Sequence, residues 1–389
     1  MNDDLPQPEP DALAHSQQLQ QVIAEQMAVS GGSISFAEFM QMALYAPGLG
    51  YYSAALQKFG SGGDFTTAPE ISTLFSRCVA SQCEEVIAEL ESADVLEVGA
   101  GSGAMAAEIL AALQRNESLP NHYYILELSG SLRARQRETI EARVPDLVER
   151  VQWIDALPES GFSGVIVSNE LLDAMPVDIF YIHDGEIFTR TVAIEEGKFI
   201  WQQKPADDDV VEVVRKLEQQ LGEPFAEGYC SEINFAARGW VTSMAECLEQ
   251  GLILQVDYGY PQHEYYHPQR NMGTLMCHYQ HRAHADPLLW VGLQDITAHV
   301  DFTAVAEAAH AVGLVVEGFT TQAHFLLSLG IEQNLASVED AGEHMQLAQQ
   351  LKQLMLPSEM GELFKVIALT KNMDIDLQGF SLQDQRSRL

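Results

Sequence analysis

The segment from Val95 to Gly103, VLEVGAGSG, constrains the fold more than any other part of this chain. A short apolar run leads directly into three glycines at alternate positions, and a helical pattern follows over residues 104–115. Glycine lets a turn adopt positive φ angles and lets a ligand approach the backbone closely. The start of the next helix offers unpaired N–H groups and a positive dipole. The pattern predicts a strand–turn–helix unit that holds a nucleotide-like cofactor, although a merely tight turn is the alternative.

Apolar runs that alternate with helical segments continue along the chain. We expect strands at 94–98, 123–128, 151–154, 164–168, 252–256, 315–319 and 365–370. This alternation predicts an α/β, Rossmann-like fold with a mostly parallel, doubly wound sheet. Residues 178–203 differ, because Asp184-Gly185 and Glu196-Gly197 separate three β-rich runs and so predict an antiparallel meander. Two helices, at about 207–221 and 231–250, are expected to follow it.

The same patterns divide the chain into four parts. Residues 1–15 form an acidic head, rich in Pro, Asp and Glu, which we expect to be disordered. Residues 16–90 are predicted to form an N-terminal helical lobe with glycine-rich loops, ending in one amphipathic helix over 72–90. Residues 91–372 form the expected cofactor-binding domain, with insertions at about 178–250 and 259–300. Residues 373–389 remain as a C-terminal tail.

Charge and cysteine content limit the function classes. The formal net charge is −35, which repels nucleic-acid phosphates and argues against a nucleic-acid partner. An acidic surface suits a basic partner, such as a protein segment that presents arginine, although solubility explains most of these charges. The five cysteines are scattered without a C-x-x-C pair, so we expect reduced thiols. No apolar run is long enough for a membrane span, and the acidic N-terminus resembles no targeting signal, so cytoplasm is the expected compartment.

The glycine spacing helps to distinguish two cofactor classes. Dinucleotide enzymes typically show G-x-G-x-x-G, whereas Gly99, Gly101 and Gly103 give G-x-G-x-G here. Glu97 lies two residues before the first glycine, where a carboxylate can meet the ammonium group of S-adenosylmethionine (SAM). The spacing therefore favours SAM over NAD.

Two more acids end the next two predicted strands. Glu127 stands where a carboxylate accepts two hydrogen bonds from a ribose diol. Asp155 stands where an acid can accept a hydrogen bond from the adenine amino group. Either acid alone could be a solvated strand end. Ligands of open α/β sheets bind at the carboxyl ends of the strands, so the three acids together support a cofactor site.

Longer segments carry a resemblance to a known family. They are YAPGLGYYS (45–53), GDFTTAPEIS (63–72), VLEVGAGSGAMAAEIL (95–110), SLRARQ (131–136), NELLDAMPV (169–177), VDYGY (256–260), GTL (273–275), DITAHVDFTAV (295–305), TQAHFLLSLGI (321–331) and MGELFKVIALTK (360–371). The chain resembles the MidA-like class I methyltransferases, a family that includes the mitochondrial arginine methyltransferase of complex I assembly. Two positions depart from the family pattern: Met276 replaces a common Arg, and Gly130 replaces a frequent Pro.

The resemblance implies SAM as cofactor and an arginine-bearing protein acceptor, with a respiratory complex I subunit as one candidate. It places NELLDAMP beside the transferable methyl group, so Asn169, Glu170 and Asp173 are the candidate acceptor residues. Carboxylates can hold a guanidinium bidentately and accept the proton that it loses. A helix cap is the alternative role for these residues. Asp64 and Thr66 lie in a glycine-rich loop that we expect to cover SAM.

Other interpretations remain open at this point. His278, His281 and His284 form H-x-x-H-x-x-H, but no acid stands at ligand spacing, so we expect no metal. His299 and Asp301 are expected to make a polar contact between insertion and core. Methylation of a small molecule, or a SAM-binding assembly factor with little turnover, are the alternative functions. A homodimer is compatible with the sequence, which does not reveal the oligomeric state.

Overall fold

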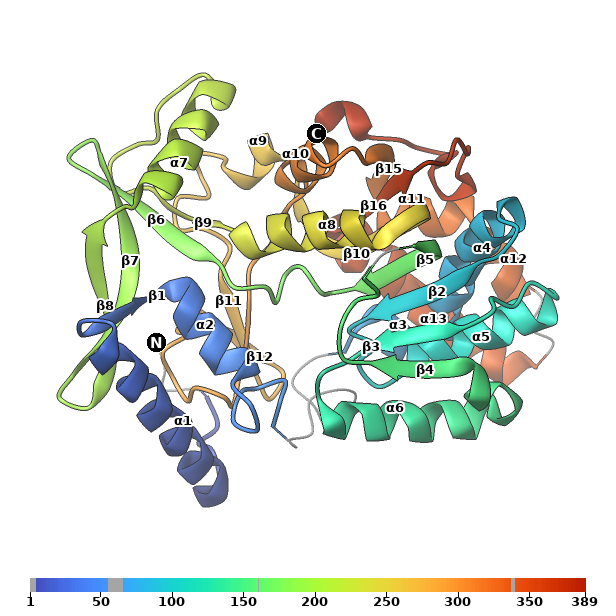
Figure 1. The fold of residues 1–389 in the computed structure, drawn as a ribbon, viewed down its shortest axis with the longest axis horizontal. Helices are drawn as coiled ribbons and strands as arrows, with labels where there is room; N and C mark the ends of the chain where they lie inside the picture. Colours follow the sequence, from blue (N-terminus) through green and yellow to red (C-terminus); the bar gives the residue numbers. More distant parts are fainter. Residues whose placement is uncertain (1–4, 55–65, 160, 337–339) are drawn as a thin grey trace.

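The computed structural model describes residues 5–54, 66–159, 161–336 and 340–389. Its main sheet has eight strands, seven of them in the order β15-β16-β10-β5-β2-β3-β4, with β14 paired to β10 (Figure 1). The bounds are β2 (Asp94–Val98), β3 (Tyr123–Leu126), β4 (Val151–Ile154), β5 (Phe162–Asn169), β10 (Leu248–Tyr260), β14 (Val300–Asp301), β15 (Val315–Thr321) and β16 (Phe364–Lys371). Only β16 runs antiparallel to its neighbours, β10 and β15. The expected mostly parallel α/β sheet is therefore confirmed.

Helices cover both faces of this sheet. One face is covered by α4 (Thr73–Glu89), α5 (Ala104–Arg115) and α6 (Gly130–Arg143), and the other by α8 (Phe235–Cys247) and α10 (Phe302–Ala311). Side chains alternate between the two cores: Val165 and Val167 of β5 join the first, and Ile166 joins the second. Successive strand residues point to opposite faces, and both faces are apolar here, so the strands read as continuous apolar runs.

A second sheet carries the inserted segment. Its path is β1 (Ser33–Ser35), β7 (Glu186–Glu195), β6 (Asp178–His183) and β9 (Cys230–Ile233), with β8 (Lys198–Pro205) paired to β7. The predicted meander is confirmed, and both of its turns have a non-glycine residue at positive φ followed by glycine. Helix α1 (Pro10–Val29) and helix α2 (Phe36–Tyr45) share a core with this sheet, as does α7 (Asp208–Leu221). These elements lie together at one end of the molecule in Figure 1.

The remaining elements complete the site and the far edge of the main sheet. A three-stranded sheet has the order β12 (Arg282–His284), β11 (Met276–Tyr279) and β13 (Asp295–Thr297). The other helices are α3 (Ala68–Ile71), α9 (Gln262–Tyr265), α11 (Gln322–Ser328), α12 (Ile331–Ala336), α13 (Ala341–Met355) and α14 (Met360–Leu363), with 3₁₀ turns at Pro145–Arg150, Gln378–Phe380 and Arg386–Arg388.

Several predicted boundaries differ from the structure. Helix α1 begins at Pro10, inside the segment expected to be disordered, because apolar residues from Leu19 onward bury one of its faces. The second helix after the meander begins at Phe235, since residues 231–233 form β9. That helix, α8, covers the main sheet, so the inserted segment ends before it. The C-terminal tail also packs against the main domain, where Phe380 is buried beside Phe325.

Two glycines let the central strands lie close together where they begin. A Cβ atom on Gly164 of β5 would lie 1.9 Å from the backbone oxygen of Asp94 in β2. A Cβ atom on Gly251 of β10 would lie 1.9 Å from the backbone oxygen of Gly164. Both glycines have φ near +140°, a region that other residues rarely adopt. The parallel core therefore depends on glycine at both positions.

All five cysteines are buried as free thiols, as expected. Among the described residues, no helix combines the length and apolar character that a bilayer crossing needs.

Candidate functional site

A cavity of about 390 Å³ lies at the carboxyl ends of the parallel strands, within the size range of small-molecule sites. Its lining comes from the main sheet, the N-terminal helices and the three-stranded sheet. The lining residues are Tyr45, Tyr52, Thr67, Pro69, Glu70, Glu97, Gly99, Ala100, Gly101, Ser102, Ala104, Met105, Glu127, Leu132, Asn169, Glu170, Leu171, Asp173, Ala174, Tyr258, Met276, His278, Asp295, Thr297, His299, Leu363 and Phe364. Strand β2 has β3 on one side and β5 on the other, so chain order reverses here, as at other ligand sites of open sheets.

The glycine turn forms one end of the cavity. Gly99, Gly101 and Gly103 all have positive φ, between 52° and 83°, which explains why glycine occupies each position. Gly99 and Gly101 line the cavity, whereas Gly103 does not. A Cβ atom on Gly103 would lie 3.0 Å from Cα of Gln136, so this glycine lets α5 and α6 pack closely. The three glycines thus have two different roles.

Glu97 is fully buried at the floor of this end. The Tyr123 hydroxyl donates a hydrogen bond of 2.5 Å to Oε2, and the buried Oε1 has no partner in the described structure. Burial raises the pKa of Glu97 to about 7, although the Tyr123 hydrogen bond lowers it. A buried carboxylate with an unpaired oxygen beside a cavity is costly unless a donor or cation binds there.

Glu127 follows β3, and a directed hydrogen-bond network holds its carboxylate. Oε1 accepts from the backbone N–H of Ser129 at 2.9 Å, and Oε2 accepts from Nε2 of Gln136 at 3.0 Å. The same Gln136 nitrogen donates to the Gly101 carbonyl at 3.1 Å, while the Gln136 oxygen accepts from Trp153 Nε1 at 2.9 Å. Gln136 therefore fixes the glycine turn and the ends of β3 and β4 relative to one another.

The other predicted cofactor residues lie differently. The side chain of Asp155 is 82% exposed, pairs with Arg133 and does not line the cavity. Thr66 is exposed and its neighbour Thr67 lines the cavity instead. Asp64 lies outside the described residues. Across the glycine turn, the Ser102 hydroxyl donates to the carboxylate of Glu70, a lining residue in α3.

The other end of the cavity follows β5. Asn169 Nδ2 donates to Glu170 Oε1 at 3.0 Å, and the buried Asn169 oxygen has no partner in the described structure. Glu170 has a φ of +51°, uncommon for a residue other than glycine, at a point where strain often accompanies function. Burial, and then the charge of Asp173, raise the pKa of Glu170 to about 8, although hydrogen bonds from the Asn169 amide and the Ala68 backbone lower it.

Asp173 completes this group. The Tyr258 hydroxyl donates to its Oδ2 at 2.5 Å, and its buried Oδ1 has no partner in the described structure. Burial raises the pKa of Asp173 to about 6. Asp257, near the carboxyl end of β10, accepts hydrogen bonds from the backbone N–H groups of Leu171 and Leu172 at 3.1 and 2.8 Å and so holds the turn in place. The cap of this turn is therefore Asp257, and the three predicted acceptor residues remain at the cavity.

Two tyrosines from the N-terminal segment line the same end. The rings of Tyr45 and Tyr52 stack with centroids 5.5 Å apart. Tyr45 donates to the carbonyl of Ala174 at 3.0 Å, and Tyr52 donates to Oδ1 of Asp295 at 2.9 Å. Burial raises the pKa of both hydroxyls, and so does the charge of Asp295. The cavity is thus closed by helix α2, the loop after it and strand β13.

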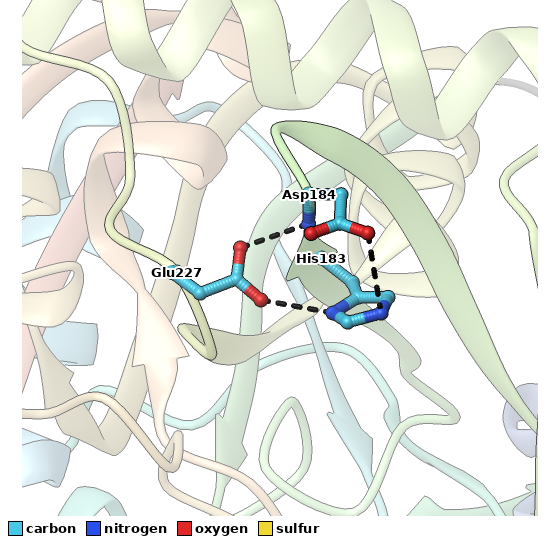
Figure 2. A group of neighbouring side chains, drawn as sticks. All are labelled: His183, Asp184 and Glu227. Carbon is cyan, nitrogen blue, oxygen red and sulfur yellow. Dashed lines mark hydrogen bonds and ion pairs between the residues drawn. The ribbon is translucent and has the colours of Figure 1, made fainter.

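The histidines separate into different environments. His278 lines the cavity from β11, but His284 pairs opposite Cys277 and therefore projects from the other face of the hairpin. His299 lies beside Tyr258 and stacks on Tyr260. Asp301 caps helix α10 by accepting hydrogen bonds from the first backbone N–H groups of that helix. Among the described residues, the one grouping with metal-ligand spacing is exposed: Glu227 bonds His183 and the backbone of Asp184 at a meander turn (Figure 2).

Several residues that build the site had no predicted role: Tyr45, Tyr52, Glu70, Gln136, Asp257, Tyr258 and Asp295. All seven stand inside motifs that carried the family resemblance, such as YAPGLGYYS, VDYGY and DITAHVDF. Polar or aromatic side chains inside these motifs were the sequence signal that could have identified them as site residues. Their partners lie up to 243 positions away in the chain, as with Tyr52 and Asp295, so local patterns do not reveal them.

Comparisons with known proteins agree with this geometry. A crystal structure from Burkholderia thailandensis, bound to S-adenosyl-homocysteine, superposes with a TM-score of 0.95 at 43% identity, over 99% of this chain and 100% of that one. The protein arginine methyltransferase NDUFAF7 of Danio rerio mitochondria is 26% identical over 88% of this chain and 84% of its own. Its Homo sapiens counterpart is 27% identical over 87% and 80%.

A family model described as "Putative S-adenosyl-L-methionine-dependent methyltransferase" matches residues 78–320, more than half of the chain. The matched region contains the glycine turn, Glu97, Glu127 and the NELLDAMP segment. The sequence match, the fold and the ligand of the similar crystal structure all agree on the cofactor, which is S-adenosyl-L-methionine. The chain therefore belongs to this family of S-adenosyl-L-methionine-dependent methyltransferases.

Proposed function

We propose that this methyltransferase acts on an arginine side chain of a protein acceptor. The observation that carries the proposal is the charge of the cavity. Six carboxyl groups line it, and no lysine or arginine of the described residues does: Glu70, Glu97, Glu127, Glu170, Asp173 and Asp295. SAM brings two positive groups and one negative group, so its net charge balances one carboxylate. A cationic acceptor favours the ionised form of the carboxyl groups of raised pKa beside it, Glu170 and Asp173.

The cofactor end suits SAM by its own chemistry. The unpaired, buried oxygen of Glu97 is an acceptor for the ammonium group, and Gly99 and Gly101 let the ligand approach the turn closely. Glu127, oriented by Gln136, is an acceptor for the ribose hydroxyls. We still expect Asp155 to contact the adenine amino group. We also expect the loop with Asp64 and Thr66 to cover the bound SAM. Bound there, SAM supplies an electrophilic methyl group on its sulfonium, and S-adenosylhomocysteine (SAH) remains after transfer.

The acceptor residues are Glu170, Asp173 and Asn169. The guanidinium of arginine stays protonated in water and is a weak nucleophile. When one of its nitrogens gains the methyl group, it loses one proton, and a carboxylate of raised pKa is suited to take that proton. Burial has raised the pKa of both Glu170 and Asp173. We assign them to orientation of the guanidinium and removal of the proton, and Asn169 to positioning Glu170.

The relatives support this acceptor class at a distance. The NDUFAF7 proteins that match at 24–28% identity are named protein arginine methyltransferases. Identity at this level leaves the particular acceptor open. A respiratory complex I subunit is the candidate implied by the family resemblance, and we keep it as the first protein to test.

The test is incubation with methyl-labelled SAM and the proteome of a strain that lacks this enzyme. Fragment mass spectra of labelled proteins then identify the modified residue. Methylated arginine is the expected result. Label on a small metabolite would assign the enzyme to small-molecule methylation. Tight binding of SAM without any labelled product would favour a binding role in assembly.

A further inference from the structure

The acceptor end of the cavity contains a carboxyl group that the acceptor role above does not use. Glu170 and Asp173 follow β5 of the main sheet, whereas Asp295 begins β13 of the separate three-stranded sheet. All three line the same cavity. The site therefore receives its negative charge from two independent parts of the fold.

Asp295 is held in a fixed orientation. It is 3% exposed, and its Oδ1 accepts hydrogen bonds from the Tyr52 hydroxyl at 2.9 Å and from the backbone N–H of Ile296 at 3.0 Å. The ring of Tyr52 is itself fixed by stacking on Tyr45. A carboxylate that is already oriented loses little conformational entropy when a ligand binds.

Asp295 also acts electrostatically on Glu170, one of the predicted acceptor residues. Burial raises the pKa of Glu170 most, and the negative charges of Asp173 and Asp295 raise it further. The same charge raises the pKa of the Tyr45 and Tyr52 hydroxyls. Among the described residues that line the cavity, no lysine or arginine offsets this field. Carboxyl groups from two different elements, Asp295 from β13 and Glu170 and Asp173 after β5, therefore face the cavity that a ligand cation would enter.

The chemistry of the cation follows from the number of acceptors. A guanidinium offers five N–H donors in one plane, more than a single carboxylate can accept. An ammonium group offers three donors at one point and is strongly hydrated. Carboxylates on separate elements suit the extended, planar cation better than the compact one.

We propose that Asp295 is a specificity-determining residue of the acceptor site, which pairs with the guanidinium of the incoming arginine from the side of the three-stranded sheet. This inference rests on the proposed function. Asp295 is distinct from the proton-accepting pair, because it selects and orients the cation. Tyr52 acts as a positioning residue that holds Asp295.

The experiment measures binding rather than turnover. Nα-acetyl-arginine methylamide is titrated into enzyme saturated with SAH, with ligand-observed NMR as the readout. The citrulline analogue, which is planar but uncharged, and the lysine analogue are titrated in parallel. The variants are Asp295→Asn, Tyr52→Phe and Glu170→Gln. Asp184→Asn, at an exposed meander turn, is the control that makes the same change in net charge.

The expected result is that Asp295→Asn weakens arginine-analogue binding about tenfold, the loss of one charged contact, with SAH affinity unchanged. Asp184→Asn should bind like the wild type. Tyr52→Phe keeps the Asp295 carboxylate but not its hydrogen bond, so it should lose less affinity for the arginine analogue than Asp295→Asn. This second variant keeps the inference testable if Asp295→Asn folds poorly. The citrulline and lysine analogues should bind the wild type more weakly than the arginine analogue.

Two results overturn the inference in different ways. If Asp295→Asn binds the arginine analogue as tightly as the wild type while Glu170→Gln does not, Asp295 has no acceptor role and the proposed function stands. If the wild type prefers the lysine or citrulline analogue, both the Asp295 role and the arginine assignment are wrong. If Asp295→Asn folds poorly, wild-type binding of the arginine analogue by Tyr52→Phe counts as the first of these results.

Discussion

Glu127 receives a hydrogen bond from Gln136 on one oxygen, while a backbone N–H group occupies the other. Both protein partners of this carboxylate are hydrogen-bond donors, so both of its oxygens must be acceptors. Gln136 is not free to rotate, because its own oxygen accepts from Trp153. The cofactor end therefore has a built-in hydrogen-bond direction that only a carboxylate at position 127 satisfies.

The first prediction is that Glu127→Gln weakens SAH binding more than the loss of charge alone. The amide NH₂ must face one of two donors, Ser129 N–H or Gln136 Nε2. We expect a loss of roughly 2–3 kcal/mol, or about a hundredfold in Kd by calorimetry. Trp153→Phe in the same variant frees Gln136 to turn its oxygen toward position 127 and should recover part of the loss. A Glu127→Gln variant with wild-type affinity would contradict this network.

The second prediction concerns pH. Burial holds the pKa of Glu97 at about 7 in the free protein, and only the ionised form pairs with the cofactor ammonium. SAH affinity should therefore rise by about tenfold between pH 6 and pH 8, as the ionised fraction grows. Glu97→Gln should bind SAH more weakly at pH 8 and lose most of this pH dependence. A wild-type affinity that is flat over this range would place the ammonium elsewhere.

The third prediction separates the catalytic role of Glu170 from its cost to stability. The pKa of Glu170 is raised to about 8 in the folded protein from an ordinary value of 4.5. Its contribution to stability is therefore full below the unfolded pKa and is lost as pH rises through 8. Glu170→Gln cannot ionise, so its melting temperature relative to the wild type should increase between pH 5 and pH 9.

The same variant should transfer methyl groups at least about a hundredfold more slowly, because the amide neither accepts the proton nor balances the guanidinium charge. SAH affinity is the internal control and should change little. A variant that is stabilised at high pH but fully active would show that Glu170 is a buried acid without a catalytic role.

Local patterns predicted the main sheet well and the acceptor end only in part. Strands β2 and β4 and helix α5 have the predicted bounds, because buried parallel strands are short apolar runs and the glycines mark the turn. Strand β9 was predicted as the start of a helix, since four residues next to a helix give no periodicity to distinguish them. Asp155 ended a strand as expected, but Arg133 from α6 pairs with it at the surface. Such partners depend on tertiary packing.

The fourth prediction concerns the start of the parallel strands. Gly164→Ala places a Cβ atom 1.9 Å from a backbone oxygen of β2, which no side-chain rotation relieves. We expect a loss of roughly 4 kcal/mol or more, seen as failure to fold or a greatly lowered denaturant midpoint. Gly185→Ala is the matched control, because Gly185 also has positive φ but has no atom within 4 Å of an added Cβ. It should cost only about 1 kcal/mol.

The pairing of β1 with β7 affects how a nascent chain reaches this structure. Ser33 pairs with Ala193, so strand β1 cannot form until about 160 further residues have been synthesised. Closing loops of that length is entropically costly and slow compared with local helix formation. Tyr52 waits longer still, for Asp295. During synthesis, the glycine turn at the cofactor end can therefore form before the residues that close the acceptor end of the cavity have left the ribosome.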